Sequence, residues 1–245
     1  MTSARANRPP SPTFTHVVIT CEHASNAVPR ELAPRFRRAT KALDSHRGWD
    51  PGAPPLARAL AQALNAPLFT GKFSRLVVDL NRSACRPAVF SEFTRPLDPV
   101  RRALLLDRYH APHWHAVESE IARAIDEDAV VLHVGVHSFT PVLHGVRRTA
   151  DFALLYDPQR PLERDLCARW LEDLAHHAPS LRLRRNYPYL GTADGLTTAL
   201  RKRFPHDRYA GIEIELNQAL LKGTTTLPRR VSDAIVRSLE QMLNG

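Results

Sequence analysis

Three short apolar segments of the chain end in or beside histidine and glutamate residues. These segments and their polar neighbours are Val17–Cys21 with Glu22 and His23, Val130–Val136 with His137 and Ser138, and Gly211–Leu216 with Glu215. Each segment has the length and composition of a buried strand. Because ligands of open α/β sheets bind where strands end, the three segments predict one site assembled from distant parts of the chain.

Strand and helix patterns alternate along the rest of the chain. Helices are predicted at residues 53–64, 99–126 with an interruption near Pro112, 162–176 and 228–243, and further strands at 67–69, 76–80 and 152–156. Such alternation indicates an α/β fold with helices on both faces of a sheet. The pattern leaves the strand order open, and it fits a parallel sheet as well as a mixed one.

The 245 residues are enough for one large α/β domain, predicted at residues 14–245 after a disordered tail at residues 1–13. The tail is rich in Arg, Ser and Pro and lacks the apolar core of a secretory signal, although its composition also suits an organellar transit peptide. No apolar run approaches the roughly 20 residues of a transmembrane helix. The three cysteines form no CxxC motif, so we expect a cytoplasmic protein without disulfides. Cys21 is interpreted as a buried strand-end residue rather than a nucleophile.

The formal net charge of +9 favours anionic partners, either nucleic acid or a small carboxylate. The basic residues are scattered in Arg pairs without interleaved aromatic residues, and no helix-turn-helix or zinc-finger spacing is present. We therefore interpret them as a solvated basic surface and expect neither nucleic-acid nor membrane partners. A basic nucleic-acid-binding protein without catalysis stays as an alternative interpretation.

The histidines that follow two of the apolar segments are candidate metal ligands. A catalytic zinc site needs three protein ligands and one open position for water, and neutral imidazole is a common ligand. His23 and His137 supply two such groups. The third ligand should be a carboxylate, for which Glu22 and Asp50 are the candidates.

The segment Ser74–Arg82 adds groups that recognise a carboxylate. Its predicted strand ends in Asn81 and Arg82, and arginine presents a planar fork that matches a carboxylate. Arg82 is therefore interpreted as the clamp for a substrate carboxylate, with Asn81 as its neutral companion. Asp79 is expected to orient the arginine or a metal-bound histidine.

Glu215 is the candidate general base. Period-two alternation places it on one face of its strand with Glu213 and Asn217, and it lies nearer the strand end than Glu213. A carboxylate beside metal-activated water can accept a proton and return it to the leaving amine. The histidines around Trp114, in contrast, are interpreted as an exposed helical face.

Taken together, these motifs resemble the N-formylglutamate amidohydrolase family. The segments that carry the resemblance are Cys21–Asn26 with Pro29, Trp49-Asp50 with Gly52-Ala53, Ser74–Arg82, His137–Pro141 and Glu215–Asn217. They occur in the family's order and span about residues 16–240. The family is similar to the zinc carboxypeptidases and aspartoacylases, so the resemblance implies a three-layer α/β/α fold with a mixed, largely parallel central sheet (phosphorylase/hydrolase-like).

The resemblance also implies site roles. An Asn-Arg pair grips the substrate carboxylate in the wider group, as Asn81 and Arg82 would here, and a strand-borne glutamate is the base, as Glu215 would be. The carboxypeptidase relatives carry a His-x-x-Glu ligand pair, whereas Asn26 stands three residues after His23. Asn26 is therefore placed with Ser138 and Asp79 around the metal. Asp50 matches the family's aspartate, and Glu22 stays as the alternative ligand.

The implied activity is zinc-dependent hydrolysis of N-formyl-L-glutamate to formate and glutamate. Zn²⁺ would be held by His23, His137 and Asp50, and a small anionic N-acyl amino acid would be the substrate. Arg75 or Arg147 would meet its side-chain carboxylate. The alternatives are hydrolysis of a different N-acyl amino acid or of a small peptide.

Overall fold

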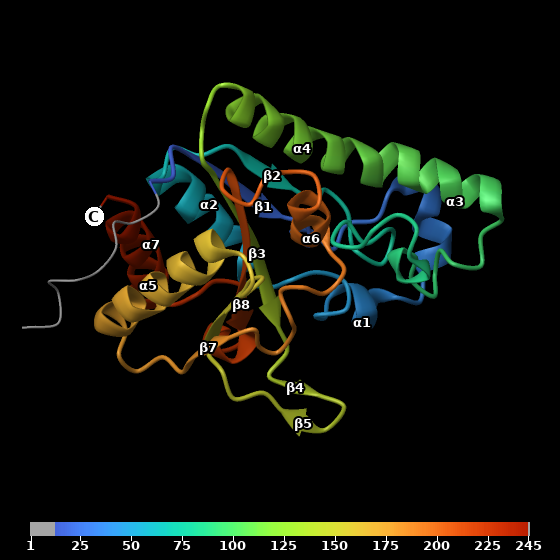
Figure 1. Ribbon diagram of the computed structural model, residues 1–245. Helices are drawn as coiled ribbons and strands as arrows, with labels where there is room; N and C mark the ends of the chain where they lie inside the picture. The colour runs from blue at the N-terminus through green and yellow to red at the C-terminus, as the bar shows by residue number, and fades with distance from the viewer. Residues whose placement is uncertain (1–12, 245) are drawn as a thin grey trace, which may run out of the picture.

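A six-stranded, mostly parallel sheet runs through the centre of the molecule, here described from a computed structural model of residues 13–244 (Figure 1). Its strands are β1 (His16–Cys21), β2 (Leu68–Thr70), β3 (Val131–Phe139), β6 (Phe152–Leu155), β7 (Leu183–Arg185) and β8 (Tyr209–Asn217). They lie in the order β2-β1-β3-β8-β6-β7. The β6–β8 pair is antiparallel and the other pairs are parallel. The sheet is thus mixed and largely parallel, as the family resemblance implies.

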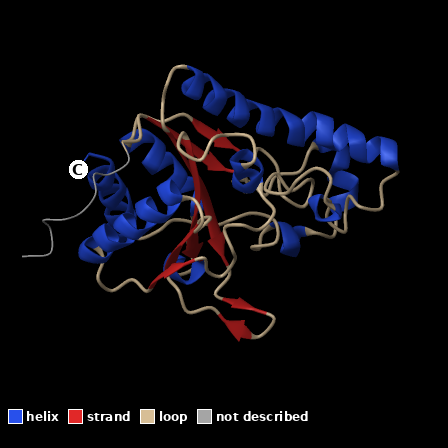
Figure 2. Ribbon diagram, in the orientation of Figure 1, coloured by secondary structure: helices blue, strands red, loops and turns tan. Residues whose placement is uncertain are grey.

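Helices cover both faces of this sheet (Figure 2). Their bounds are α1 (Thr40–Leu43), α2 (Ala53–Ala63), α3 (Pro99–Leu105), α4 (Ala111–Asp126), α5 (Pro161–His177), α6 (Leu196–Arg201) and α7 (Arg229–Asn244). One apolar cluster joins the sheet to α2, α5 and α7, and another joins it to α4 and α6. The prediction of a three-layer α/β/α fold is therefore confirmed.

Successive side chains of the central strand β3 point alternately to the two faces of the sheet. On β3, Leu132, Val134 and Val136 pack into the cluster with α2, α5 and α7. Because successive side chains of a strand point to opposite faces, His133 and His137 lie on the other face of the sheet. Two-residue periodicity thus separates an apolar face from a polar one, and the polar face carries the chemistry.

A second region packs beside the sheet around its own apolar cluster. It contains the 3₁₀-helices η1 (Arg30–Phe36) and η2 (Pro87–Val89) and the irregular segment between β2 and α3. The prediction of a strand at residues 76–80 is wrong, because turns fold this segment back on itself. The Val77 amide donates to the Ser74 carbonyl at 2.8 Å, and the Asp79 amide donates to the Val89 carbonyl at 2.9 Å. The apolar run reflects burial in the second cluster rather than pairing in the sheet.

Other element boundaries also shift. Strand β3 continues to Phe139, so His137 lies inside the strand and not after it. The interruption of the long helical stretch is a π-helical turn, η3 (Leu106–His110), directly before α4. A hairpin of β4 (Val142–Leu143) and β5 (Val146–Arg147), which the sequence pattern did not indicate, projects from the body of the molecule (Figure 1). A short 3₁₀-helix, η4 (Gln218–Leu221), follows β8.

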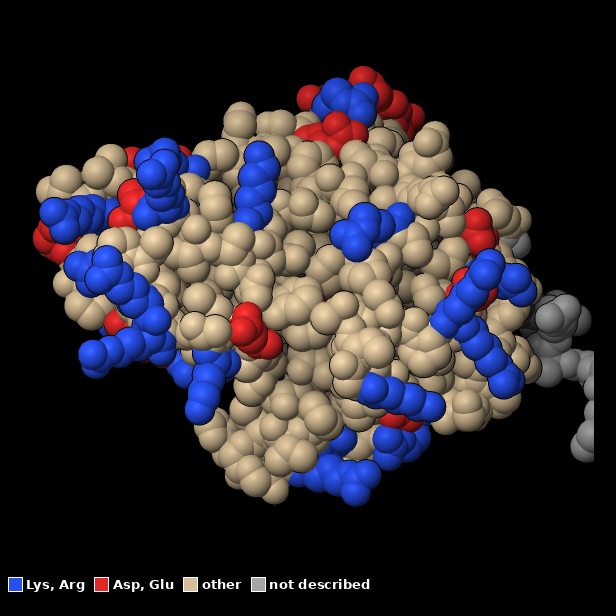
Figure 3. Space-filling model, turned by 180° about the vertical axis from the view of Figure 1, so that it is seen from behind, with Lys and Arg blue, Asp and Glu red and all other residues tan. Residues whose placement is uncertain are grey.

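The described residues include no helix long and apolar enough to cross a membrane. The predicted disordered tail, residues 1–13, lies outside the described residues except for Thr13. On the face drawn in Figure 3, Lys and Arg side chains are dispersed among other residues and form no continuous stripe. Cys21 and Cys167 are buried and Cys85 is exposed, each as a free thiol.

A buried ion pair ties the outer helices to the central sheet. Glu163 of α5 contacts Arg201 of α6, with Oε1 2.9 Å from Nε. The same carboxylate accepts hydrogen bonds from the amides of Gly211 and Asp157. Arg201 also donates to the carbonyls of Gly191 and Gly211. The pair thus fixes β8 against α5 and α6.

Replacing Glu163 with Ala is expected to destabilise the fold by about 3–5 kcal/mol, because Arg201 would stay buried without a counter-charge. Asp165→Ala is the matched control on the same helix, since Asp165 forms a surface pair with Arg164. Its expected cost is about 0.5 kcal/mol or less. Urea-induced unfolding measures both, and equal midpoints for the two variants would contradict the expectation.

Candidate active site

Three buried side chains converge at the carboxyl end of β1 and β3. His23 follows β1, Asp50 lies in the loop before α2, and His137 lies on β3. Asp50 Oδ2 is 3.3 Å from His23 Nδ1 and 3.0 Å from His137 Nδ1. The backbone amide of Asp50 donates to the His23 carbonyl at 2.9 Å, which fixes the loop against the strand end. One atom from each residue lies within 4.8 Å of the others.

The remaining nitrogen of each imidazole faces a different carboxylate. His23 Nε2 is 2.7 Å from Asp79 Oδ1, and His137 Nε2 is 3.0 Å from Glu22 Oε2. A metal-ligating histidine commonly donates its outer N–H to a carboxylate, which leaves the other nitrogen free for the metal. Glu22 therefore contacts the nitrogen of His137 that points away from Asp50. Asp79 occupies the equivalent outer position at His23.

The convergent donors could hold a metal ion. Two imidazole nitrogens and a carboxylate oxygen are the ligand set of a catalytic site that keeps one position open. Burial alone would raise the pKa of Asp50, but the charge of His23 and hydrogen bonds from both histidines outweigh it and lower that pKa. The carboxylate is thus ionised at neutral pH, as metal ligation requires.

The irregular segment after β2 places two arginines and an amide beside this cluster. Asn81, Arg82 and Arg75 line a cavity of about 160 Å³ that also contains the cluster. Arg75 donates to Asp79 Oδ2 from Nε at 3.2 Å and from Nη2 at 2.7 Å. Burial opposes ionisation of Asp79, yet Arg75 and His23 hold its pKa well below the usual range. Arg75 therefore serves to hold the carboxylate behind His23.

Arg82 and Asn81 differ from Arg75 in their contacts. Arg82 donates from Nη1 to the Asp194 carbonyl at 2.5 Å and forms no ion pair among the described residues. Asn81 Oδ1 accepts a hydrogen bond from the Leu196 amide at 2.8 Å, and its Nδ2 lies 3.4 Å from His137 Nε2. Both side chains are held by backbone groups at the wall of the cavity, which leaves the charge of Arg82 available to an anion.

Glu215 faces the same cavity from β8. It is the register partner of His137 on β3. Its Oε2 is buried without a hydrogen-bond partner. Burial raises the pKa of Glu215 to about 8, and the carboxylates of Asp50 and Glu213 add to this effect while His137 opposes it. Glu213, by contrast, accepts a hydrogen bond from Thr197 Oγ1 at 2.8 Å. Of the two carboxylates that β8 directs to the cavity, Glu215 is thus the one with a buried, unpartnered oxygen.

The sequence also assigned three further residues to the site, namely Ser138, Asn26 and Arg147. Ser138 supports Asp50, because its amide lies 3.2 Å from Asp50 Oδ2. Asn26 donates to Asp44 at 2.9 Å and contacts none of the three convergent residues. Arg147 is exposed on β5 and is not among the residues that line the cavity.

Comparison with known proteins identifies the family of this chain. The family model for N-formylglutamate amidohydrolase matches residues 15–222. This chain belongs to that family. It is therefore a hydrolase that acts on an amide. A search of curated proteins found no match.

Two solved structures are similar to this amidohydrolase family member. The gene product Atu2144 from Agrobacterium tumefaciens is 29% identical, with a TM-score of 0.75 over 95% of this chain and 92% of that one. N-formylglutamate amidohydrolase from Ralstonia eutropha JMP134 is 19% identical, with a TM-score of 0.65 over 93% of this chain and 91% of that one. The second likeness shows a shared fold.

Several residues of the amidohydrolase site gave no clear sequence signal. His46 lines the cavity from a loop. His110 and His113, interpreted from sequence as part of an exposed helical face, are largely buried. His110 Nε2 is 2.7 Å from the Arg82 carbonyl, and His113 Nε2 is 3.7 Å from Glu22 Oε1. Their three-residue spacing, which puts both on one side of the helix, was the available signal.

Proposed function

We propose that this amidohydrolase is zinc-dependent and hydrolyses N-formyl-L-glutamate to formate and L-glutamate. The observation that carries the proposal is the buried group of His23, Asp50 and His137 beside a carboxylate with an uncommitted oxygen, Glu215. The three convergent residues would hold the zinc ion. When bound, zinc polarises the amide carbonyl and makes the attacking water more acidic.

Glu215 is proposed to move the proton. Its Oε2 takes a proton from the water as the water oxygen adds to the formyl carbon. As the carbon–nitrogen bond breaks, Glu215 returns the proton to the amine nitrogen, and formate and the amino acid result. With no cation bound, burial raises the pKa of Glu215. A divalent ion bound at the neighbouring ligands would lower that pKa, because a nearby positive charge favours the ionised carboxylate.

The cavity supports a small anionic substrate. Its volume of about 160 Å³ is well below that of sites for drug-sized ligands. Arg82, beside Asn81, would bind the α-carboxylate through its forked guanidinium. Leu155 and Gly191 form part of the wall, and a formyl group is the smallest acyl group that such a cavity would have to hold.

Formate release from N-formyl-L-glutamate tests the proposal. We expect zinc-loaded protein to release formate, chelation to abolish release, and added zinc to restore it. No release from protein with stoichiometric zinc would exclude this substrate, and N-acetyl and N-succinyl amino acids would then be assayed. Release that resists chelation would exclude zinc dependence.

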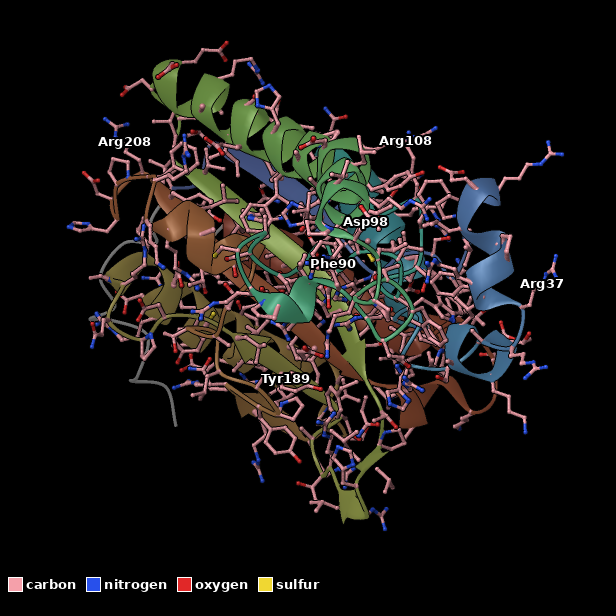
Figure 4. All side chains as sticks on the ribbon, turned by 90° about the vertical axis from the view of Figure 1, so that its right-hand side faces the viewer. Arg37, Phe90, Asp98, Arg108, Tyr189 and Arg208 are labelled. Carbon is pink, nitrogen blue, oxygen red and sulfur yellow. The ribbon has the colours of Figure 1, made fainter. Side chains whose placement is uncertain are left out.

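Arg82→Met is expected to raise KM for N-formyl-L-glutamate about 100-fold with a smaller change in kcat, because a hydrogen-bonded charge pair is worth about 1.5–3 kcal/mol. Arg37→Met is the control, since Arg37 is exposed, does not line the cavity and lies well apart from the cavity residue Tyr189 (Figure 4). Steady-state kinetics measures both variants. A KM for Arg82→Met within twofold of wild type would refute the role of Arg82.

A further inference from the structure

Arg148 follows the β4–β5 hairpin, and its guanidinium lies against two aromatic rings. Its Cζ is 5.0 Å from the ring centroid of Tyr189 and 5.7 Å from that of Phe139. Both aromatic residues line the active-site cavity. Tyr189 belongs to the segment between β7 and α6, on the lower part of the view in Figure 4. The guanidinium thus lies against two residues of the cavity wall, and Arg148 itself is not among the residues that line the cavity.

The charge of Arg148 has no counter-ion in the described part of the chain. Its Nη1 is buried without a hydrogen-bond partner. No described carboxylate lies within ion-pair distance of the guanidinium. A buried cationic donor without an acceptor is costly, so its presence points to an anion that the chain itself does not supply. Cation–π contact with two rings holds the guanidinium beside residues of the cavity wall, and its Nη1 donor has no acceptor among the described residues.

A third cavity residue places Arg148 near the same space. Burial lowers the pKa of His46, and the positive charge of Arg148 is the largest charge effect in the same direction. His46 lines the cavity together with Phe139 and Tyr189. The guanidinium is therefore close to cavity residues from three separate loops and strands.

The other arginines near the site are committed or remote. Arg75 is held by Asp79, and Arg82 is assigned to the α-carboxylate of the substrate. Arg147, which the sequence suggested for a second carboxylate, is exposed on the hairpin. Arg148 alone among these four combines proximity to cavity residues with an unsatisfied buried donor.

We infer that Arg148, stacked between Phe139 and Tyr189, binds the distal carboxylate of the substrate and makes the enzyme selective for N-acyl derivatives of dicarboxylic amino acids. This inference rests on the proposed function. The selectivity comes from a residue outside the Asn81-Arg82 pair and outside the metal ligands. A substrate with a neutral side chain leaves the Arg148 donor unpaired.

The test compares Arg148→Met with Arg147→Met, adjacent variants that lose the same charge. The substrates are N-formyl-L-glutamate and N-formyl-L-norvaline, which has the same chain length without the distal carboxylate. We expect Arg148→Met to lower kcat/KM for the glutamate derivative about 100-fold, mainly through KM. The norvaline derivative should change less than threefold, and that result also shows that the variant is folded. Arg147→Met should leave both values within twofold.

Equal losses on the two substrates would reduce Arg148 to a structural role and overturn the inference. A loss in Arg147→Met instead would move the recognition to the exposed neighbour. Binding of L-glutamate and L-norvaline to the zinc-loaded protein, measured by calorimetry, separates this inference from the reaction. If no formate is released but Arg148→Met still weakens glutamate binding about 100-fold, the proposed reaction fails and the inference holds. Equal binding of both amino acids to wild type would refute it.

Discussion

Replacing Glu215 with Gln is expected to lower kcat by about 10²–10⁴-fold, the usual contribution of general acid–base catalysis. The amide keeps the size and polarity of the side chain but cannot accept the proton of the attacking water. Glu215 is 5% exposed and faces the cavity with an unpartnered oxygen, so the substitution adds little strain. Zinc content and KM should stay close to wild type, because neither the ligands nor Arg82 is altered.

Glu213→Gln is the matched control for this prediction. Glu213 lies two residues earlier on the same face of β8, and Thr197 donates a hydrogen bond to it. We expect its kcat to fall less than tenfold. Steady-state kinetics measures kcat and KM of both variants, and mass spectrometry measures their zinc content. Loss of zinc in Glu215→Gln would show that Glu215 is a ligand, and a larger kcat loss in Glu213→Gln would transfer the base role to that residue.

Asp50→Asn is expected to abolish stoichiometric zinc binding and, with it, formate release. Asp50 lies between the Nδ1 atoms of His23 and His137, and its charge is required in a site with two neutral imidazoles. Glu22→Gln is the decisive comparison, because Glu22 contacts the outer nitrogen of His137. Loss of such an outer contact weakens metal affinity by about 10–100-fold, so this variant should still bind zinc at saturating metal.

Zinc titration with a competing chelator distinguishes the two variants. If Glu22→Gln loses stoichiometric zinc while Asp50→Asn retains it, Glu22 is the third ligand and the proposed set is wrong. Thermal unfolding with and without zinc gives a second readout, since a ligand that binds the native state raises its stability. Zinc should raise the unfolding temperature of wild type and Glu22→Gln, and not that of Asp50→Asn.

The main strands of the fold were predictable because their side-chain patterns are local. Apolar residues in β1, β3 and β8 are spaced for one buried face, and the polar residues of the opposite face are visible in the same segments. The segment Ser74–Arg82 shows the limit of this reasoning. Its apolar run is buried by a neighbouring cluster of loops, and burial alone does not distinguish a strand from a turn.

The site was predictable in residue type and only partly in arrangement. The motifs name His23, Asp50 and His137, and these residues lie together. Motifs do not say which nitrogen of a histidine faces which acid, because that depends on side chains brought from other segments. The sequence favoured Asp50 as the ligand and kept Glu22 as the alternative, and the structure places the two acids on either side of His137.

The adjacent residues Arg147 and Arg148 show the same limit of sequence analysis. Both are arginines, and the sequence analysis suggested Arg147, beside Arg75, for the side-chain carboxylate of the substrate. The hairpin leaves Arg147 exposed and places Arg148 against Phe139 and Tyr189. In an extended backbone, a shift of one residue reverses the direction of the side chain, and only contacts with distant segments set that register.

By itself, the sequence determined the α/β class, the apolar strands and the chemical groups available for amide hydrolysis, because these depend on residue type and short-range spacing. The tertiary structure alone decided the strand order, the turns of Ser74–Arg82, the outer partners of the two histidines and the uncommitted oxygen of Glu215. Those features depend on packing between residues that are far apart in the chain, and no local pattern encodes such contacts.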